Sequence, residues 1–272
     1  MTITVTRDFG ARTVAASSLR SVPGTSSVLG LTRRSFPVGL SEGRLPIRAI
    51  HGVSVSPGDA WFLYVNGSEV PLGPATRSIH SGDRIWWDLH PAAASTHSVV
   101  GSFPEPFVHG IGGKRLPTTL ECASDVGQAC RRVSSALEAI GVPVAVQTPG
   151  TGSGTDSLAV AVGTWADLRG EIVTELLQKG PSASGVYARF GASGRSLELL
   201  EARGVTVRHL LRGGGLIAAI AQGSNPPTWL ITGTDPAGVG SAADALTAAR
   251  LRDRFALAVS AGVDVPLPVP SR

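Results

Sequence analysis

In one short segment, RIWWDLH (residues 84–90), side chains that could bind a ligand alternate with apolar ones. Trp86, Asp88 and His90 take every second position, with apolar residues between them. Successive side chains of a β-strand point to opposite faces, so an extended segment places these three on one face with Arg84. This arrangement predicts a ligand-binding surface. The alternative is structural: Trp86 covers the sheet, and its indole N–H finds a nearby partner.

A second apolar segment, WFLYVNG (residues 61–67), adds Tyr64 and Asn66 to the candidate ligand-binding residues. Asn66-Gly67 closes this strand, and a turn at residues 81–83 leads into the strand that carries Trp86. Asn-Gly and Gly-Asp pairs supply the positive φ angles that tight turns need. The two segments therefore predict paired strands, and one face of the second strand is core.

A weaker candidate site is the turn TGTDPAGVGSA (residues 232–242), where Gly233, Thr234 and Gly238 could bind an anion through free amides at a helix start. The glycine spacing is neither GxGxxG nor that of a P-loop. Ordinary helix-start chemistry is the alternative and is favoured, with Asp235 as N-cap and Pro236 at the first helical position.

The two cysteines, Cys122 and Cys130, are separated by seven residues. In a reducing compartment such a pair would be buried thiols or a redox motif, but this is not CxxC spacing. A disulfide between the end of a strand and the following helix fits better. It requires an oxidising compartment and so predicts a secreted or cell-surface location.

Metal binding and catalysis have little support in the sequence. Five of the six histidines lie between residues 51 and 109, but none forms an HxH or HxxxH pair. No carboxylate pair or nearby cysteine completes a metal set, so we predict no metal site. There is no GxSxG, and the only cysteines are the predicted disulfide pair. We therefore expect a protein that is not an enzyme.

The elements that position the candidate residues can be placed by hydrophobic periodicity. We predict a hairpin over residues 2–22 around Gly10, a helix over 26–36 and a strand over 47–53, followed by the central pair of strands. This order agrees with a β-grasp fold, in which a mixed sheet wraps one helix, although periodicity alone does not establish that topology.

The first part of the chain, about residues 1–110, resembles a bacterial domain family of unassigned function. That family is similar to the small C-terminal β-grasp domain of the cobalamin carriers transcobalamin and intrinsic factor. The matching residues are Trp61, Phe62, Tyr64, Val65, Asn66, Gly67, Gly82, Asp83, Ile85, Trp86, Trp87 and Asp88. The resemblance implies a β-grasp domain and, as the ligand, a corrinoid, for which His90 would offer an axial nitrogen. No cofactor is otherwise expected.

We divide the chain into a β-grasp domain (1–90), a packed connector (91–121) and an α/β layered domain (122–272). The fold class of the whole chain is therefore predicted as α+β, and the α/β assignment of the second half rests on alternating helix and strand patterns. They predict helices over 124–141, 166–180 and 236–254, strands over 142–147, 158–165, 184–190, 215–222, 227–235 and 255–267, and a hairpin over 196–213.

Composition supports a folded chain of two domains: of 272 residues, 42% are hydrophobic and 16% are charged. The net charge of +4 is carried by scattered arginine and lysine pairs, which argues against nucleic-acid binding. The longest apolar runs are too short to cross a membrane. An export signal is missing, so the protein is either cytosolic or, as we prefer, a mature form that begins with an added Met.

Together these features predict a non-catalytic, secreted or cell-surface protein that binds a small molecule. In a second hypothesis, the aromatic face is part of a structural or adhesion module that binds a partner protein or glycan. A deep cleft with Trp86 on its wall would favour the first, and a flat exposed aromatic patch the second. An enzyme of unknown type, the third hypothesis, would need convergent ionisable groups in one pocket.

Overall fold

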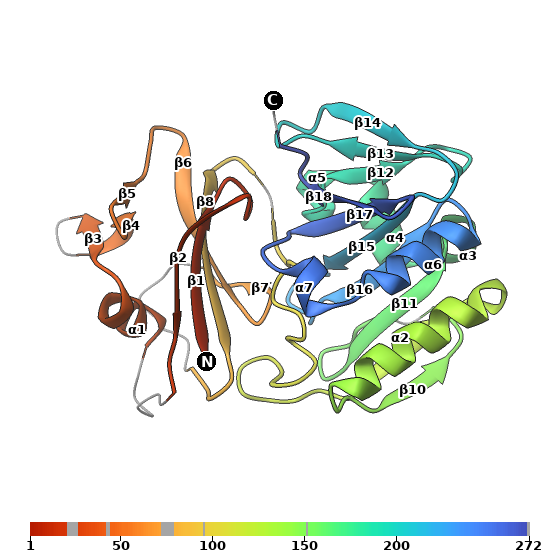
Figure 1. Ribbon diagram of the computed structural model, residues 1–272, viewed down its shortest axis with the longest axis horizontal. Helices are drawn as coiled ribbons and strands as arrows, with labels where there is room; N and C mark the ends of the chain where they lie inside the picture. Colours follow the sequence, from red (N-terminus) through yellow and green to blue (C-terminus); the bar gives the residue numbers. More distant parts are fainter. Residues whose placement is uncertain (21–26, 42–43, 72–78, 95, 151, 271–272) are drawn as a thin grey trace.

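The protein is a mixed α and β structure with several sheets, arranged as two packed halves (Figure 1). The computed structural model describes residues 1–20, 27–41, 44–71, 79–94, 96–150 and 152–270. The first half holds a five-stranded sheet, and the second half holds a seven-stranded sheet with helices on its faces.

The five-stranded sheet has the order β2-β1-β8-β6-β7. Its central pair, β1 and β8, is parallel, and its other neighbours are antiparallel. As the sequence predicts, a hairpin comes first and the 59–65 and 84–91 strands are paired. The strands are β1 (Thr2–Arg7), β2 (Arg12–Ser18), β6 (Asp59–Val65), β7 (Ser68–Glu69) and β8 (Arg84–Pro91).

One face of this sheet packs against helix α1 (Val28–Ser35). The side chain of Ser27 caps the helix by accepting a hydrogen bond from Gly30 N, and Leu31 is buried with Ile85 and Trp87. The predicted helix began at residue 26, which lies outside the described residues. A small sheet follows, formed by β3 (Val38–Ser41), β4 (Arg44–Ile50) and β5 (Val53–Ser54).

The predicted strand 47–53 is divided in the structure. β4 ends at Ile50, because His51 and Gly52 both have positive φ and form the turn into β5.

The seven-stranded sheet has the order β10-β9-β11-β16-β15-β17-β18. The first four strands in this order are parallel, and β15, β17 and β18 are added antiparallel. The strands are β9 (Thr118–Cys122), β10 (Val144–Gln147), β11 (Leu158–Thr164), β15 (Gly215–Ile220), β16 (Thr228–Gly233), β17 (Ala256–Ser260) and β18 (Val263–Leu267).

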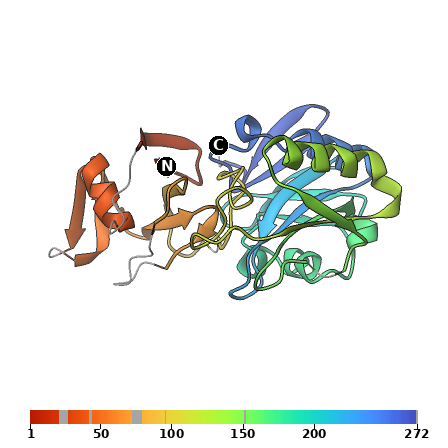
Figure 2. The ribbon, with the colours of Figure 1, turned by 90° about the horizontal axis from the view of Figure 1, so that it is seen from below.

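Both faces of this sheet are covered, as the apolar runs of its strands predict. On one face lie α2 (Gly127–Ala139), preceded by a 3₁₀ turn (Ser124–Val126), and α6 (Pro236–Asp244) (Figure 2). The other face packs on α3 (Trp165–Leu168), α4 (Ile172–Gln178) and a three-stranded sheet of β12 (Ala188–Phe190), β13 (Leu197–Leu200) and β14 (Thr206–Leu210). The short helix α5 (Pro181–Ser184) precedes β12.

Three long elements predicted for the second half are each interrupted. The helix expected over 166–180 breaks at Gly170, where φ is +107°. The helix expected over 236–254 ends at Asp244, and Thr247 caps a new short helix, α7 (Ala248–Leu251). The strand expected over 255–267 is a hairpin of β17 and β18, because Ala261 and Gly262 both have positive φ.

The predicted connector, residues 91–121, is packed against the second half. Its last residues, however, form a strand. Phe103 and Phe107 lie against Trp229, with ring centroids 5.8 and 5.0 Å away. Strand β9 begins at Thr118, inside the predicted connector, because its backbone pairs with both β10 and β11. The second half therefore begins a few residues before position 122.

The second face of the five-stranded sheet, opposite α1, is covered by the second half of the chain. Phe255, just before β17, contacts the rings of Phe9, Tyr64 and Trp86, and Val100 N donates a hydrogen bond to its carbonyl (3.2 Å). We call this side of the sheet the rear face. It carries the predicted ligand-binding residues of β6 and β8.

Candidate functional site

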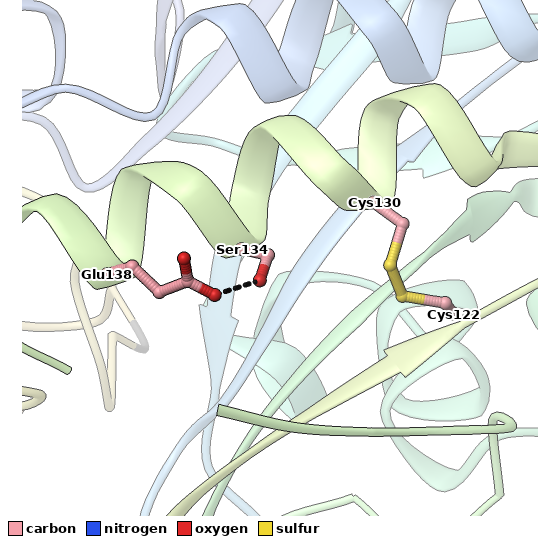
Figure 3. The surroundings of a disulfide bond; sticks show 4 residues. All are labelled: Cys122, Cys130, Ser134 and Glu138. Atoms are coloured by element: carbon pink, nitrogen blue, oxygen red, sulfur yellow. Dashed lines mark hydrogen bonds between the residues drawn. A yellow bond between two sulfur atoms is a disulfide. The ribbon is translucent and has the colours of Figure 1, made fainter. Parts of the chain in front are cut away.

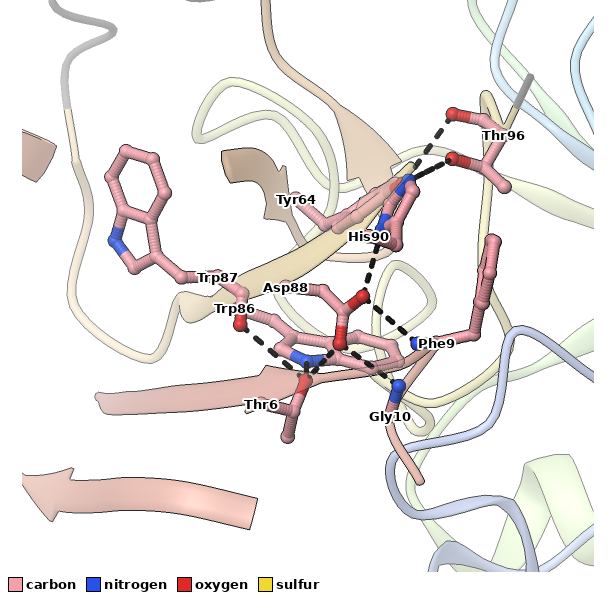
Figure 4. A network of polar contacts seen from close by, with 9 residues as sticks. All are labelled: Thr6, Phe9, Gly10, Tyr64, Trp86, Trp87, Asp88, His90 and Thr96. Carbon is pink, nitrogen blue, oxygen red and sulfur yellow. Dashed lines mark hydrogen bonds and ion pairs between the residues drawn. The ribbon is translucent and has the colours of Figure 1, made fainter. Parts of the chain in front are cut away.

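Strand register brings most of the predicted residues together on the rear face. Trp86 lies opposite Thr4 of β1 and Tyr64 of β6, and Asp88 lies opposite Thr6 and Phe62. The alternation in the sequence thus predicted the shared face correctly. Trp87 points to the other side of β8, toward α1 (Figure 4), where its indole N–H donates to Thr32 Oγ1 (3.0 Å).

Asp88 is the centre of a buried polar network (Figure 4). Its carboxylate accepts hydrogen bonds from the backbone N–H groups of Phe9 (3.1 Å) and Gly10 (2.9 Å) and from the hydroxyl of Thr6. Positive φ angles at both residues of the turn aim these amides at the carboxylate. Trp86 donates its indole N–H to Thr6 Oγ1 (2.6 Å), which is the partner that the structural interpretation of Trp86 expects.

His90 extends this network and has no exposed side-chain surface. Its Nδ1 lies 2.7 Å from Asp88 Oδ1, and its ring is stacked between Phe62 (4.0 Å between centroids) and Phe9 (4.5 Å). Its Nε2 lies 3.5 Å from Thr96 Oγ1. Both ring nitrogens thus face protein groups, so His90 has no free nitrogen on an open surface.

Tyr64 and Asn66 are also engaged within the protein. The Tyr64 hydroxyl hydrogen-bonds with Thr96 Oγ1, and burial raises the pKa of this phenol well above its usual range. Asn66 donates through Nδ2 to Asp83 Oδ1 (2.8 Å) and to Gly110 O (2.7 Å), and its own φ is +52°. Asn66 stabilises the turn after β6 and stands apart from the Asp88 network.

The rear face is therefore not the open ligand surface that the sequence suggested. Tyr64, Trp86, Asp88 and His90 come together, but each is buried against the second half or within the network. The physical reason is the aromatic cover from the second half, above all Phe255. Of the five candidates, Trp86 also lines a cleft.

This cleft, of about 460 Å³, lies between the rear face and the loop after α7. Hydroxyl groups dominate the wall that the first half contributes, and two arginines and one aspartate supply the charge. The lining residues are Thr2, Thr4, Thr13, Ala16, Ser17, Ser18, Arg84, Ile85, Trp86, Gly101, Ser102, Arg252 and Asp253. The arrangement suits binding of a small polar molecule between the halves.

Electrostatics in the cleft come from groups that are partly buried. Burial lowers the pKa of the Arg84 guanidinium; the carboxylate of Glu105 opposes this shift and the charge of Arg252 adds to it. Arg84 also donates from Nη1 to Phe103 O (2.9 Å). Burial raises the pKa of the Asp253 carboxyl, which Arg252 and Arg254 counteract. Asp253 has a φ of +56°, an uncommon backbone conformation for this residue type.

The turn predicted as a weak anion site is filled by its own side chain. Asp235 accepts hydrogen bonds from Gly238 N (2.8 Å) and Gly213 N (2.9 Å), so it caps α6 as the alternative interpretation predicted. Thr234 Oγ1 donates to Leu211 O (2.6 Å). A Cβ at Gly238 would lie 2.3 Å from Gly214 O, so this glycine is explained by close packing. Gly233 and Gly238 need no anion to account for them.

The predicted disulfide between Cys122 and Cys130 is present (Figure 3). It joins the last residue of β9 to the first turn of α2, with the two Cα atoms 6.0 Å apart.

Over the described ranges, no three histidine, cysteine, aspartate or glutamate side chains are grouped so that they could hold a metal ion. Within the same ranges, no helix has both the length and the apolar character that a membrane crossing requires.

Sequence reasoning missed the charged residues of the cleft. Arg84 shares the alternation of Trp86 and was recognised only as part of that face. Arg252 and Asp253 fall at the end of a segment predicted as one helix, and nothing in their local sequence indicates that they approach β1 and β8. Their position depends on how the two halves pack.

Comparison of the chain with models of protein families, with curated proteins and with solved structures finds no match.

Proposed function

We propose that this protein is a non-catalytic binding protein that holds a small polar molecule in the cleft between its halves. The observation that carries this proposal is the cleft itself, about 460 Å³ in volume, with Trp86 in its lining and walls from both halves. Volumes of roughly 300–1,000 Å³ are typical of small-molecule sites, and such sites often lie between domains.

The assignment of the first half as a β-grasp domain belongs to the same proposal. The order β2-β1-β8-β6-β7, with β1 and β8 parallel at the centre and α1 on one face, supports it. In the cobalamin carriers that the first half resembles, the ligand lies between the small domain and a larger one. The position of the cleft between the two halves agrees with that arrangement.

A corrinoid is less favoured as the ligand than a smaller polar molecule. The cleft is lined mainly by hydroxyl and charged groups. His90, the residue expected to offer an axial nitrogen, is fully buried between two phenylalanine rings. A large macrocycle would need a broad apolar wall, and the apolar side chains that line the cleft are Ala16, Ile85 and Trp86.

A non-catalytic role is supported by the chemistry of the lining. Its ionisable side chains are Arg84, Arg252 and Asp253, and no histidine, lysine or cysteine stands beside the serine and threonine hydroxyls to activate one of them. Among the described residues, Asp88 and His90 form the one carboxylate and imidazole pair in which both side chains are buried, and neither has exposed side-chain surface.

A location outside the cytosol is also part of the proposal, and the disulfide supports it. The adhesion hypothesis has less support, because it needs an exposed aromatic patch. Among the described residues, the large hydrophobic side chains that are exposed are all aliphatic: Val146, Ile172, Val205, Val207, Leu211 and Val263.

The test is to block the cleft and measure ligand binding. Saturation-transfer NMR would be run with a panel of small sugars, sugar acids and sugar phosphates, and with cyanocobalamin. Ala16 lies in the cleft wall and is exposed, so Ala16→Trp should fill the cleft without disturbing the core. We expect at least one panel member to bind and its signal to disappear in Ala16→Trp.

The matched control is Ser135→Trp. Ser135 is an exposed residue of α2, and α2 contributes no residue to the cleft lining. It should bind as the unmodified protein does. Binding that persists in Ala16→Trp, or a panel in which nothing binds, would contradict the proposal.

A further inference from the structure

Two arginine side chains, one from each half, converge on the cleft. Arg84 begins β8 in the first half, and Arg252 follows α7 in the second. Within the described part of the chain neither forms an ion pair with a carboxylate. The Glu105 carboxylate acts on Arg84 without forming an ion pair with it. Like charges repel, so two guanidiniums that face one cleft favour an anion between them.

The guanidinium of Arg84 has N–H donors that could bind a ligand. A guanidinium carries five N–H donors in a planar fork, and the structure engages Nη1 of Arg84 with the carbonyl of Phe103 (2.9 Å). That bond anchors the side chain at the cleft. An anchored guanidinium loses less conformational entropy when it binds a ligand than a free one does.

Asp253 is the one carboxylate of the lining, and its negative charge partly offsets the positive charge of the two arginines. With two positive groups and one negative group, the formal charge of the lining is 2 − 1 = +1 when all three are ionised. No ion pair within 4.0 Å joins Asp253 to either arginine. The carboxylate therefore reduces the positive potential of the cleft without occupying the guanidinium donors.

The loop that carries Arg252 is fixed in place by close backbone packing. A Cβ at Gly10 would lie 2.0 Å from Asp253 O, and a Cβ at Gly101 would lie 2.8 Å from Arg254 N. Only glycine permits these approaches. The two glycines hold the second half's loop against the first half, so the distance between the arginines is set by the fold.

Hydroxyl groups form much of the remaining wall. Thr2 and Thr4 of β1 share the rear face with Thr13 and Ser18 of β2, because Thr2 pairs with Ser18 and Thr6 pairs with Thr13. Ser102 also lines the cleft. A hydroxyl both donates and accepts hydrogen bonds, so this wall is complementary to a ligand that itself carries hydroxyl groups.

We propose that the ligand of this cleft is a small hydroxylated molecule with one oxyanion group, a carboxylate or a phosphate monoester, held between Arg84 and Arg252. This inference rests on the binding function proposed above. The arginines recognise the oxyanion by charge-assisted hydrogen bonds, which guanidinium groups form with carboxylate and phosphate in a bidentate geometry. The threonine and serine wall binds the hydroxylated body.

Isothermal titration calorimetry with three matched probes tests this inference: glucose, glucuronate and glucose 6-phosphate. The anionic probes are expected to bind, and glucose at least tenfold more weakly. The two anions separate carboxylate from phosphate recognition. Raising the salt concentration should weaken the anionic probes, because the partly exposed arginines are screened.

Arg252→Gln is the informative variant, since Arg252 is exposed and its replacement leaves the core intact. It should reduce the affinity for the anionic probes at least tenfold. Arg84→Gln should also reduce the affinity for the anionic probes at least tenfold. Because Arg84 donates a hydrogen bond to the Phe103 carbonyl, circular dichroism should check that this variant is folded. Arg131→Gln, an exposed arginine of α2, is the matched control and should change nothing.

The outcomes separate this inference from the proposed function. If glucose binds as tightly as the anions and Ala16→Trp abolishes its binding, the cleft is a binding site and the oxyanion inference is wrong. If the anions bind equally well to Arg252→Gln, the inference is also wrong. If none of the three probes binds, the inference fails, and the wider panel decides whether the cleft binds anything.

Discussion

Asp88 is the residue on which the rear face most depends. Its carboxylate is fully buried and receives two backbone amides, a hydroxyl and the His90 imidazole. A buried charge is tolerated only when its hydrogen-bonding capacity is satisfied. A side chain that reads in the sequence as a ligand-facing acid is thus the structural centre of the sheet's covered face.

Asp88→Ala should destabilise the fold strongly, because it leaves the amides of Phe9 and Gly10 and the ring of His90 without their acceptor. We expect a loss of about 3–5 kcal/mol in the free energy of unfolding, measured by urea denaturation. Asp8→Asn is the control, since the exposed carboxylate makes only surface ion pairs and asparagine, like aspartate, tolerates the φ of +60° at this position. It should change the free energy of unfolding by about 0.5 kcal/mol or less. Equal stability of the two variants would contradict the central role of Asp88.

At the scale of elements, the disulfide fixes the junction between β9 and α2. Cys122 ends the strand and Cys130 lies one turn into the helix, with a short loop between them. Closing this loop covalently restricts the unfolded chain, which stabilises the folded state by an amount that depends on loop length.

The double variant Cys122→Ala/Cys130→Ala should lower the free energy of unfolding by about 2–3 kcal/mol, as the loop-entropy relation gives for a loop of this size. Guanidinium denaturation of the oxidised protein, with and without reductant, provides the measurement. Reductant should destabilise the unmodified protein and leave the double variant unchanged. If reductant has no effect on either protein, the bond does not contribute to stability.

Elements were predictable from the sequence where a local signal defines them. Gly10 and Asn66-Gly67 mark tight turns, and the alternation along β8 gave the correct face for Trp86 and Asp88. Long helices and strands of the second half were predicted without their breaks. The break at Gly170 did have a local signal, because its φ of +107° is a conformation that glycine adopts readily. Local patterns also could not reveal that Phe255 covers the rear face or that Arg252 enters the cleft.

At the scale of the whole molecule, the two halves depend on each other through the aromatic residues of the rear face. Phe255 contacts four rings of the first half, lying edge-on to Phe9, Tyr64, Trp86 and His90 at 5.1–5.5 Å between centroids. Such buried aromatic groups stabilise by area and by ring geometry. The halves should therefore lose stability together when this contact is removed.

Phe255→Ala tests this coupling. It should lower the free energy of unfolding by about 3–5 kcal/mol, as deletion of a buried phenylalanine ring does in other proteins. Hydrogen exchange read by mass spectrometry should show lower protection in both halves, including β1 and β8. The control is Phe190→Ala, whose buried ring stacks on Trp165 within the second half, and its effect should be largest there. Loss of protection confined to the second half in Phe255→Ala would contradict the coupling.

The parallel pairing of β1 with β8 has a consequence for how the chain folds as it leaves the ribosome. Thr6 and Asp88 hydrogen-bond across 82 positions of sequence, so β1 emerges long before its partner strand exists. The rear face can be covered only after Phe255 has been synthesised. Until that point the aromatic rings that Phe255 covers lack this contact, so the first half acquires its final packing only after Phe255 has been added to the chain.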